Sequence, residues 1–195
     1  MRHQSTRHDA AHRHAIGYTL WPASFELTEP GAFLDEAESL RVDSVEVPLF
    51  CTRLIADGRI VEPAWRWFEG HLSGRDLGVT AHAMLGINLM DAPGAIPGHE
   101  RVARANIELA ARMGARVLVV HCGMSSETGQ ALEDAYARQR ESLARLGDHA
   151  ASMGVEICVE TIWSFDGRAT ALPSRLAAEI RAIGHEAVGA TLDYA

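Results

Sequence analysis

The sequence contains no lysine. All 18 basic residues among its 195 residues are arginine, and 26 acidic residues outnumber them, which gives a formal net charge of −8. Without a lysine amine the chain cannot form a Schiff base with a carbonyl substrate, and it cannot contain the Gly-Lys-Ser/Thr of a phosphate-binding P-loop. The negative charge argues against general binding to nucleic acids or to anionic membranes, so we expect neither as a partner.

Long hydrophobic runs and cysteines are also scarce. No apolar run approaches the roughly 18 residues that a membrane-spanning helix needs. The three cysteines, Cys51, Cys122 and Cys158, are an odd number in a chain long enough to form a core, so we expect no disulfide framework and a reducing, cytoplasmic location. Residues 1–14 are rich in histidine and lack the apolar segment of a secretory signal. We expect them to form a disordered tail, with a metal-binding histidine tract as the alternative.

Short apolar segments alternate with amphipathic ones through residues 15–195, which we expect to form one domain. Because each predicted strand follows a helix and a turn, the strands should be parallel and joined by right-handed crossovers. The predicted strands are Ile16–Trp21, Asp43–Leu49, Leu77–His82, Ala115–His121, Val155–Glu160 and Ala187–Asp193. The predicted helices are Phe33–Leu40, Pro63–Leu72, Glu100–Met113, Leu132–Met153 and Ser174–Ile183.

A polar residue lies at or near the end of five of these strands, and the five recur at a regular interval. Glu46, His82, His121, Glu160 and Asp193 are separated by 36, 39, 39 and 33 residues. One βα unit at each step is typical of a (β/α)₈ TIM barrel of about 250 residues. A doubly wound sheet is the rival, but the first loop lacks its G-x-G-x-x-G. We therefore predict an α/β fold of the TIM (β/α)₈ type, with only its first six βα units in this chain, truncated or completed by other means.

The carboxyl ends of the strands form the functional face of such folds. Glu160 follows a buried apolar strand and needs a cation, a metal or a proton there, a structural ion pair with an arginine being the alternative. Asp193 ends the sixth strand in the same way, or else caps a helix. His82 and His121 suit a metal or a substrate hydroxyl, or else are core histidines. Together they predict a divalent metal site, in which oxygen ligands favour Mn²⁺, Mg²⁺ or Co²⁺ and the histidines keep Zn²⁺ open.

Three further residues near the strand ends are predicted to contact substrate. Glu46 is the weakest of them, because it precedes Val47-Pro48-Leu49 and a mid-strand salt bridge would also explain it. Trp21 ends the first strand and Trp163 follows Glu160 by three residues. Either tryptophan can stack on a sugar face or fill the rim of the core.

The segments LGVTAH, ARVLVVHCG, MGVEICVET and VGATLDYA, with their order of His, His-x-Gly, Glu and Asp, resemble the xylose isomerase-like TIM barrels. This group of sugar phosphate isomerases and epimerases shares ancestry with endonuclease IV. The resemblance implies that Glu160 and Asp193 are metal ligands, that Glu160 also moves protons, and that His82 and His121 touch substrate or metal. The sequence departs from the family pattern at Cys122, where the family often has proline. It departs again after Asp193, where the family's next histidine and two further βα units do not follow.

The resemblance therefore implies a metal-dependent sugar or sugar phosphate isomerase or epimerase of carbohydrate metabolism. The proton next to a metal-polarised carbonyl would be transferred by a carboxylate, and Mn²⁺ is the expected ion. The expected partner is a small sugar or polyol, and a homo-oligomer is allowed. Three alternatives stay open: an endonuclease IV-like phosphodiesterase, a dehydratase of the inosose or dehydroshikimate type on the same barrel, and an inactive fragment.

Overall fold

The computed structural model describes residues 15–161 and 172–193. Its central feature is a sheet of six strands that follow one another across the sheet in chain order, and every neighbouring pair is parallel. The strands are β1 (Gly17–Thr19), β2 (Ser44–Pro48), β5 (Gly78–His82), β6 (Val117–His121), β7 (Glu156–Glu160) and β8 (Val188–Thr191). Among the described residues, β1 pairs only with β2 and β8 only with β7.

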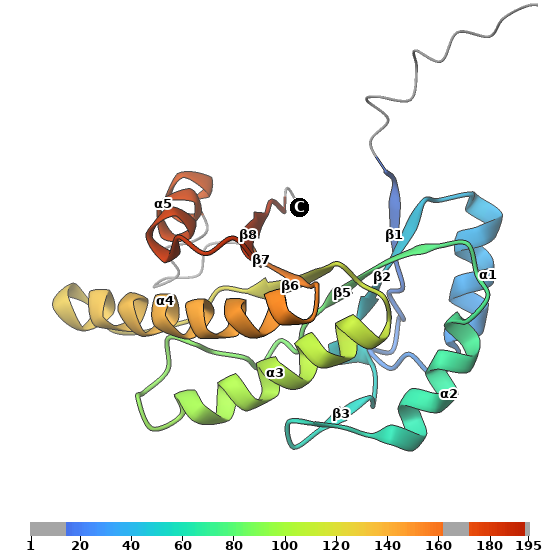
Figure 1. Cartoon of the computed structure of the whole chain (residues 1–195), viewed down its shortest axis with the longest axis horizontal. Coiled ribbons are helices and arrows are strands. Elements are labelled where there is room, and N and C mark those ends of the chain that lie inside the picture. The colour runs from blue at the N-terminus through green and yellow to red at the C-terminus, as the bar shows by residue number, and fades with distance from the viewer. Residues whose placement is uncertain (1–14, 162–171, 194–195) are drawn as a thin grey trace, which may run out of the picture.

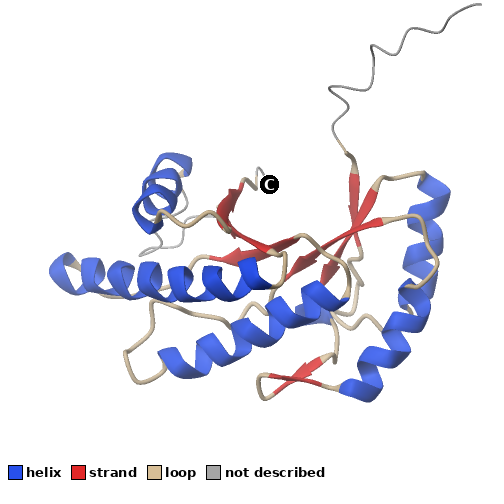
Figure 2. Ribbon diagram, in the orientation of Figure 1, coloured by secondary structure: helices blue, strands red, loops and turns tan. Residues whose placement is uncertain are grey.

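In the part of the chain that the structure describes, five α-helices connect these strands. They lie around the outside of the sheet (Figures 1 and 2). Each one lies in the chain between two neighbouring strands of the sheet, as successive βα units require. They are α1 (Pro30–Leu40), α2 (Glu62–Leu72), α3 (Ile96–Arg112), α4 (Gly129–Ser152) and α5 (Pro173–Ile183). None of the helices described is long and apolar enough to cross a membrane.

A small hairpin interrupts the connection between β2 and α2. The short helix η1 (Leu49–Cys51) is followed by β3 (Ile55–Ala56) and β4 (Arg59–Ile60), which pair antiparallel. The turn between the two strands is Asp57-Gly58, and both residues have positive φ, at 49° and 66°. Asp-Gly is a favoured pair for such a turn, because glycine and aspartate tolerate this conformation better than most residues.

The two faces of the central strands have different environments. In β6, Leu118 and Val120 belong to the main hydrophobic core together with Leu143 and Leu146 of α4. Val119 and His121 alternate with them and therefore face the opposite side of the sheet. Burying each leucine of this core contributes about 1.5–3 kcal/mol to the free energy of unfolding, so the helix-facing side of the sheet accounts for much of the stability. The opposite face of the sheet can therefore carry polar groups.

The predicted alternation of parallel strands and helices is confirmed, and all six strands and five helices are present. The structure begins α3 four residues before the predicted start at Glu100, because Pro97 occupies its first turn, where a missing backbone N–H costs nothing. The 3₁₀ helix η1 and the hairpin β3–β4 were not predicted. The expected tail, residues 1–14, lies outside the described residues.

Candidate active site

Three neighbouring strands bring polar side chains together at their carboxyl ends. His82 is the last residue of β5, His121 of β6 and Glu160 of β7. Register pairs His121 with Glu160, and pairs His82 with Val119, two residues before His121. Because paired residues of parallel strands point to the same face and side chains alternate along a strand, all three side chains lie on the face turned away from the helices.

Both imidazoles converge on one carboxylate oxygen of Glu160. Oε2 of Glu160 lies 3.1 Å from Nε2 of His121 and 3.3 Å from Nε2 of His82. The two imidazole rings meet edge to face, with centroids 4.9 Å apart. His82 is buried, and Glu160 and His121 are partly buried. One ligand atom from each of the three residues lies within 4.8 Å of the other two, which is close enough for one ion to reach all three.

The hydrogen bonds of the cluster decide its charge. Burial alone raises the pKa of Glu160, but hydrogen bonds from His121 and His82 outweigh burial and lower the pKa from 4.5 to about 2. Burial lowers the pKa of His82, but its bonds to Glu160 and to the Ala83 carbonyl and the charges of Glu46 and Glu160 reverse this, so that the pKa is raised above 6.5. Glu160 is therefore ionised at neutral pH, which is the state that a metal ligand or a general base requires.

The donor atoms of the cluster fit a divalent cation. Nδ1 of His82 lies 3.1 Å from the carbonyl oxygen of Ala83, which only accepts hydrogen bonds, so Nδ1 carries a proton. When the imidazole is neutral, the lone pair of Nε2 points toward Oε2 of Glu160, 3.3 Å away, so these two atoms could hold a divalent cation together. A backbone carbonyl that fixes the tautomer in this way is the usual outer contact of a metal-binding histidine.

Glu46 lies on the same face as the cluster, on the next strand. Its Cα pairs with Thr19 of β1 and Thr80 of β5, and Oε1 accepts a hydrogen bond of 3.4 Å from the Thr19 hydroxyl. Burial raises the pKa of Glu46, which the charge of His82 counteracts and the charge of Glu160 reinforces. Glu46 therefore extends the polar surface of the cluster toward β1.

An aromatic wall, formed by Trp21, Phe25 and Phe50, leads from the solvent to the cluster. Trp21 contacts Phe25 and Phe50 edge to face at centroid distances of 5.3 and 5.6 Å, and Phe50 contacts the ring of His82 at 5.2 Å. Trp21 is 50% exposed and Phe25 58% exposed. Sequence reasoning identified Trp21 and missed the two phenylalanines, although Phe50 directly follows the second predicted strand.

The other predicted residues are placed less centrally. Asp193 lies two residues beyond the end of β8 and is exposed. Its backbone N–H donates a 2.8 Å hydrogen bond to the hydroxyl of Thr161, the residue after Glu160. Asp193 is thus held next to the end of β7 but is not one of the three residues that converge. Trp163 lies outside the described residues.

Comparison with known proteins places this arrangement in context. The family model of the xylose isomerase-like TIM barrel matches residues 34–195. The search of curated proteins gave no match. Among solved structures, a D-tagatose 3-epimerase-like protein superposes with a TM-score of 0.73 at 18% identity, covering 92% of this chain and 65% of its own.

Two other solved structures are similar to the same extent. D-allulose 3-epimerase from Methylomonas sp., in complex with D-allulose, gives a TM-score of 0.74 at 16% identity, covering 92% of this chain and 62% of its own. The 3-keto-D-glucoside 4-epimerase of E. coli gives 0.73 at 15% identity, covering 93% and 69%. The chain therefore spans about two thirds of the length of these structures, and at such identities the likeness concerns the fold. It confirms the predicted α/β fold of the TIM (β/α)₈ type for the six units present.

Proposed function

Because the chain belongs to the xylose isomerase-like TIM barrel family, we propose that it acts as a metal-dependent sugar isomerase or epimerase. The observation that carries this proposal is the convergence of His82, His121 and Glu160 at the carboxyl ends of three parallel strands. That end of the strands is where enzymes of this fold bind their substrates. The three solved structures compared above are two sugar epimerases and an epimerase-like protein, and one of them is in complex with D-allulose.

Glu160 is the proposed base of the reaction. Ionised at neutral pH, its carboxylate would accept the proton from the carbon next to a sugar carbonyl, and His82 and His121 would hold the carboxylate in place. The aromatic wall would stack on the apolar face of the sugar, and Glu46 would accept hydrogen bonds from its hydroxyls. Trp163 remains proposed as a second stacking residue. A cytoplasmic location fits the three cysteines, which are buried and form no disulfide with one another.

A divalent cation is the proposed cofactor, with Mn²⁺ first and Mg²⁺, Co²⁺ or Zn²⁺ as alternatives. Glu160 would hold it, together with His82 and His121 from the cluster or with Asp193 as the sequence motif implies. When bound, such an ion polarises a carbonyl and makes the neighbouring C–H more acidic. An N₂O donor set suits Mn²⁺, Co²⁺ and Zn²⁺ better than Mg²⁺, which prefers oxygen ligands alone.

Hydrogen exchange tests the proposal directly. Removing a proton from the carbon next to the carbonyl and returning one to the same face of that carbon needs a single base. Inverting the configuration of the carbon needs a base on each face. Exchange therefore tests the proposed role of Glu160 by itself. D-Fructose, D-tagatose and D-allulose incubated with the chain and Mn²⁺ in D₂O should gain deuterium next to the carbonyl. Glu160→Gln should slow this by about 10²-fold or more. Glu141→Gln, at an exposed position of α4, serves as the matched control and should leave the rate unchanged.

Exchange that is absent for every ketose, or equal in the wild-type chain and Glu160→Gln, would overturn the proposal. A dehydratase on the same barrel begins with the same proton abstraction, and it would be recognised by loss of water from a keto-polyol.

The His-His-Glu cluster also favours a second function, a phosphodiesterase of the endonuclease IV type, because two imidazoles and a carboxylate suit zinc. The net charge of −8 opposes this reading, since binding to DNA needs a positive surface. A gel-shift titration with abasic-site DNA in the presence of Zn²⁺ separates the two functions. Binding in the nanomolar range would favour the nuclease, and we expect none.

A further inference from the structure

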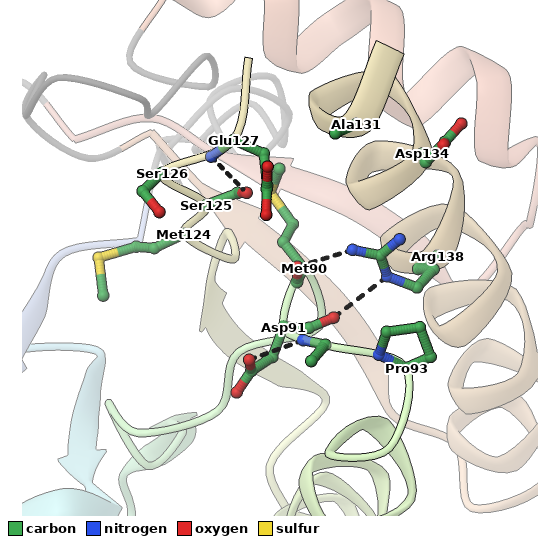
Figure 3. A pocket seen from close by; sticks show the side chains of 11 residues that line it. Met90, Asp91, Pro93, Met124, Ser125, Ser126, Glu127, Ala131, Asp134 and Arg138 are labelled. Carbon is green, nitrogen blue, oxygen red and sulfur yellow. Dashed lines mark hydrogen bonds between the residues drawn. The ribbon is translucent and has the colours of Figure 1, made fainter. Parts of the chain in front are cut away.

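A cavity of about 400 Å³ lies beside the proposed active site. It lies between the loop that follows β5, the loop that follows β6 and the first turns of α4 (Figure 3). Since β5 ends at His82 and β6 ends at His121, both loops leave the sheet at the cluster. The volume falls within the range of about 300–1,000 Å³ that small-molecule sites occupy. No residue of the cluster or the aromatic wall lines the cavity, so it is a space distinct from the one around the cluster.

The walls of the cavity are fixed by hydrogen bonds. Asn88 of the first loop accepts a bond of 2.8 Å from the backbone N–H of Met124 in the second loop and donates one of 3.0 Å to its carbonyl. From α4, Arg138 donates through Nε to the carbonyl of Asp91 at 3.1 Å. His99 lies 3.0 Å from the Asp91 carboxylate. A ligand therefore meets walls that are already ordered, which reduces the entropy cost of binding.

The polar groups that face the cavity favour a neutral polyhydroxy ligand. They come from Ser125, Ser126, Glu127 and Arg138 (Figure 3). Asp134 also lines the cavity, but its carboxylate points away and accepts a 2.9 Å hydrogen bond from Gln130. Carboxylates accept hydrogen bonds from sugar hydroxyls, and the serines and the arginine donate to them. Three acidic residues, Asp91, Glu127 and Asp134, line the cavity against one basic residue, Arg138, so the net charge of the lining is negative and would repel a phosphate or carboxylate group on the ligand.

The apolar part of the lining suits the C–H faces of a sugar ring. Met90, Pro93 and Ala131 contribute aliphatic surface on the side of the first loop and of α4, and Met124 does so from the second loop. The lining as a whole is more polar than apolar, which suits a polyhydroxy ligand better than a mainly hydrophobic one.

We propose that the cavity holds a second, uncharged sugar ring, so that the substrate is a glycoside with a reacting ring at the cluster and its neighbour between the two loops. This inference rests on the proposed function, because it names the substrate class of that same site. It favours a neutral disaccharide-sized substrate over a free or phosphorylated monosaccharide.

Methyl NMR on the chain labelled with ε-¹³C-methionine, in the presence of the diamagnetic ion Zn²⁺, tests occupancy of the cavity. The probes are D-fructose and three disaccharides that carry fructose as the reacting ring: lactulose, turanose and isomaltulose. At least one disaccharide should shift the methyl signals of Met90 and Met124, whereas D-fructose should leave Met90 unshifted. Met113, which is buried, and Met153, which is 40% exposed, lie outside the cavity and are the matched controls.

A cavity-filling variant tests affinity. Ala131 is exposed on α4 and lines the cavity, so Ala131→Trp should fill the cavity without disturbing the core. We expect disaccharide affinity to fall by roughly tenfold or more and D-fructose affinity to stay the same, as measured by isothermal titration. Ala151→Trp, at an exposed position near the other end of α4, should change neither. Fructose 6-phosphate should bind no better than D-fructose.

The outcomes separate this inference from the function on which it rests. If D-fructose binds and exchanges its proton but no disaccharide shifts Met90, or Ala131→Trp weakens both ligands equally, the inference is wrong and the proposed function stands. If neither D-fructose nor any disaccharide binds or exchanges, the proposed function fails and the inference fails with it.

Discussion

At the scale of single residues, the carboxylate of Glu160 organises the site, because two imidazoles share one of its oxygens. The sequence predicted that polar residues at the ends of parallel strands would gather at one edge, and His82, His121 and Glu160 do so. It could not predict which of them touch, since this depends on the two-residue offset between His82 and His121 in the register. Phe25 was missed because it lies in a loop at a positive φ of 56°, a conformation that no periodicity reveals.

The cluster should make the stability of the metal-free chain depend on pH. The lowered pKa of Glu160 means that its stabilisation is present above pH 4.5 and is lost as the pH falls toward about 2. The raised pKa of His82 means that its stabilisation is present below pH 6.5 and is lost as the pH rises through the higher folded value. The contribution of the cluster to the free energy of unfolding should therefore be greatest between pH 4.5 and 6.5.

Urea denaturation across this pH range, with EDTA present, measures the effect. Glu160→Gln removes the charge that both histidines face, so the difference in unfolding free energy between wild type and variant should be largest inside that window. Glu141→Gln should follow the wild type at every pH. A difference that does not change with pH would show that the charges of the cluster contribute nothing to stability.

At the scale of elements, the loops after β5 and β6 are packed against each other at Gly123. A Cβ at this position would lie 2.6 Å from Cγ of Met90 and 2.8 Å from Oδ1 of Asn88. The backbone N–H of Gly123 also donates a 2.6 Å hydrogen bond to the side-chain oxygen of Gln139 in α4. The sequence predicted the helices and strands on either side, because these have a clear period. The contact between the loops could not be predicted, since it joins segments without any period, and the same is true of the two-residue strands of the hairpin.

Gly123→Ala should therefore destabilise the chain. The added methyl group must displace Met90 or Asn88, and such overpacking typically costs about 1–3 kcal/mol of unfolding free energy. Gly70→Ala is the matched control, because Gly70 lies inside α2 with nothing within 4 Å of an added Cβ. It should stabilise the chain by about 0.5–1 kcal/mol. Equal unfolding free energies for Gly123→Ala and the wild type, by urea denaturation, would refute the close packing of the two loops.

At the scale of the whole molecule, the six strands form an open sheet in the part of the chain that the structure describes. The interval of 33 to 39 residues between polar strand ends predicted the order and direction of the strands, because each step is one βα unit. Large apolar side chains are exposed near both edges, with Ile16 beside β1 at 64% and Leu192 beside β8 at 48%. Unpaired strand edges with apolar neighbours are prone to pair with another chain.

The isolated 195-residue chain should therefore self-associate. Sedimentation velocity over a range of concentrations should show the average mass rising with concentration. The double variant Ile16→Lys and Leu192→Lys should shift this rise to higher concentration, because charge at an edge opposes pairing. Leu40→Lys, at a 56% exposed position at the end of α1, should behave as the wild type. A monomer at every concentration would contradict association through the edges.

The most direct test of the account is a titration of the chain with Mn²⁺, followed by the electron paramagnetic resonance of the free ion. We expect one Mn²⁺ per chain, bound through Glu160. Glu160→Gln should weaken the affinity by about tenfold or more, while Glu141→Gln should bind as the wild type does. Affinity that is unchanged in Glu160→Gln, or a wild-type chain that binds no Mn²⁺, would contradict the claim that this cluster is a metal-dependent active site.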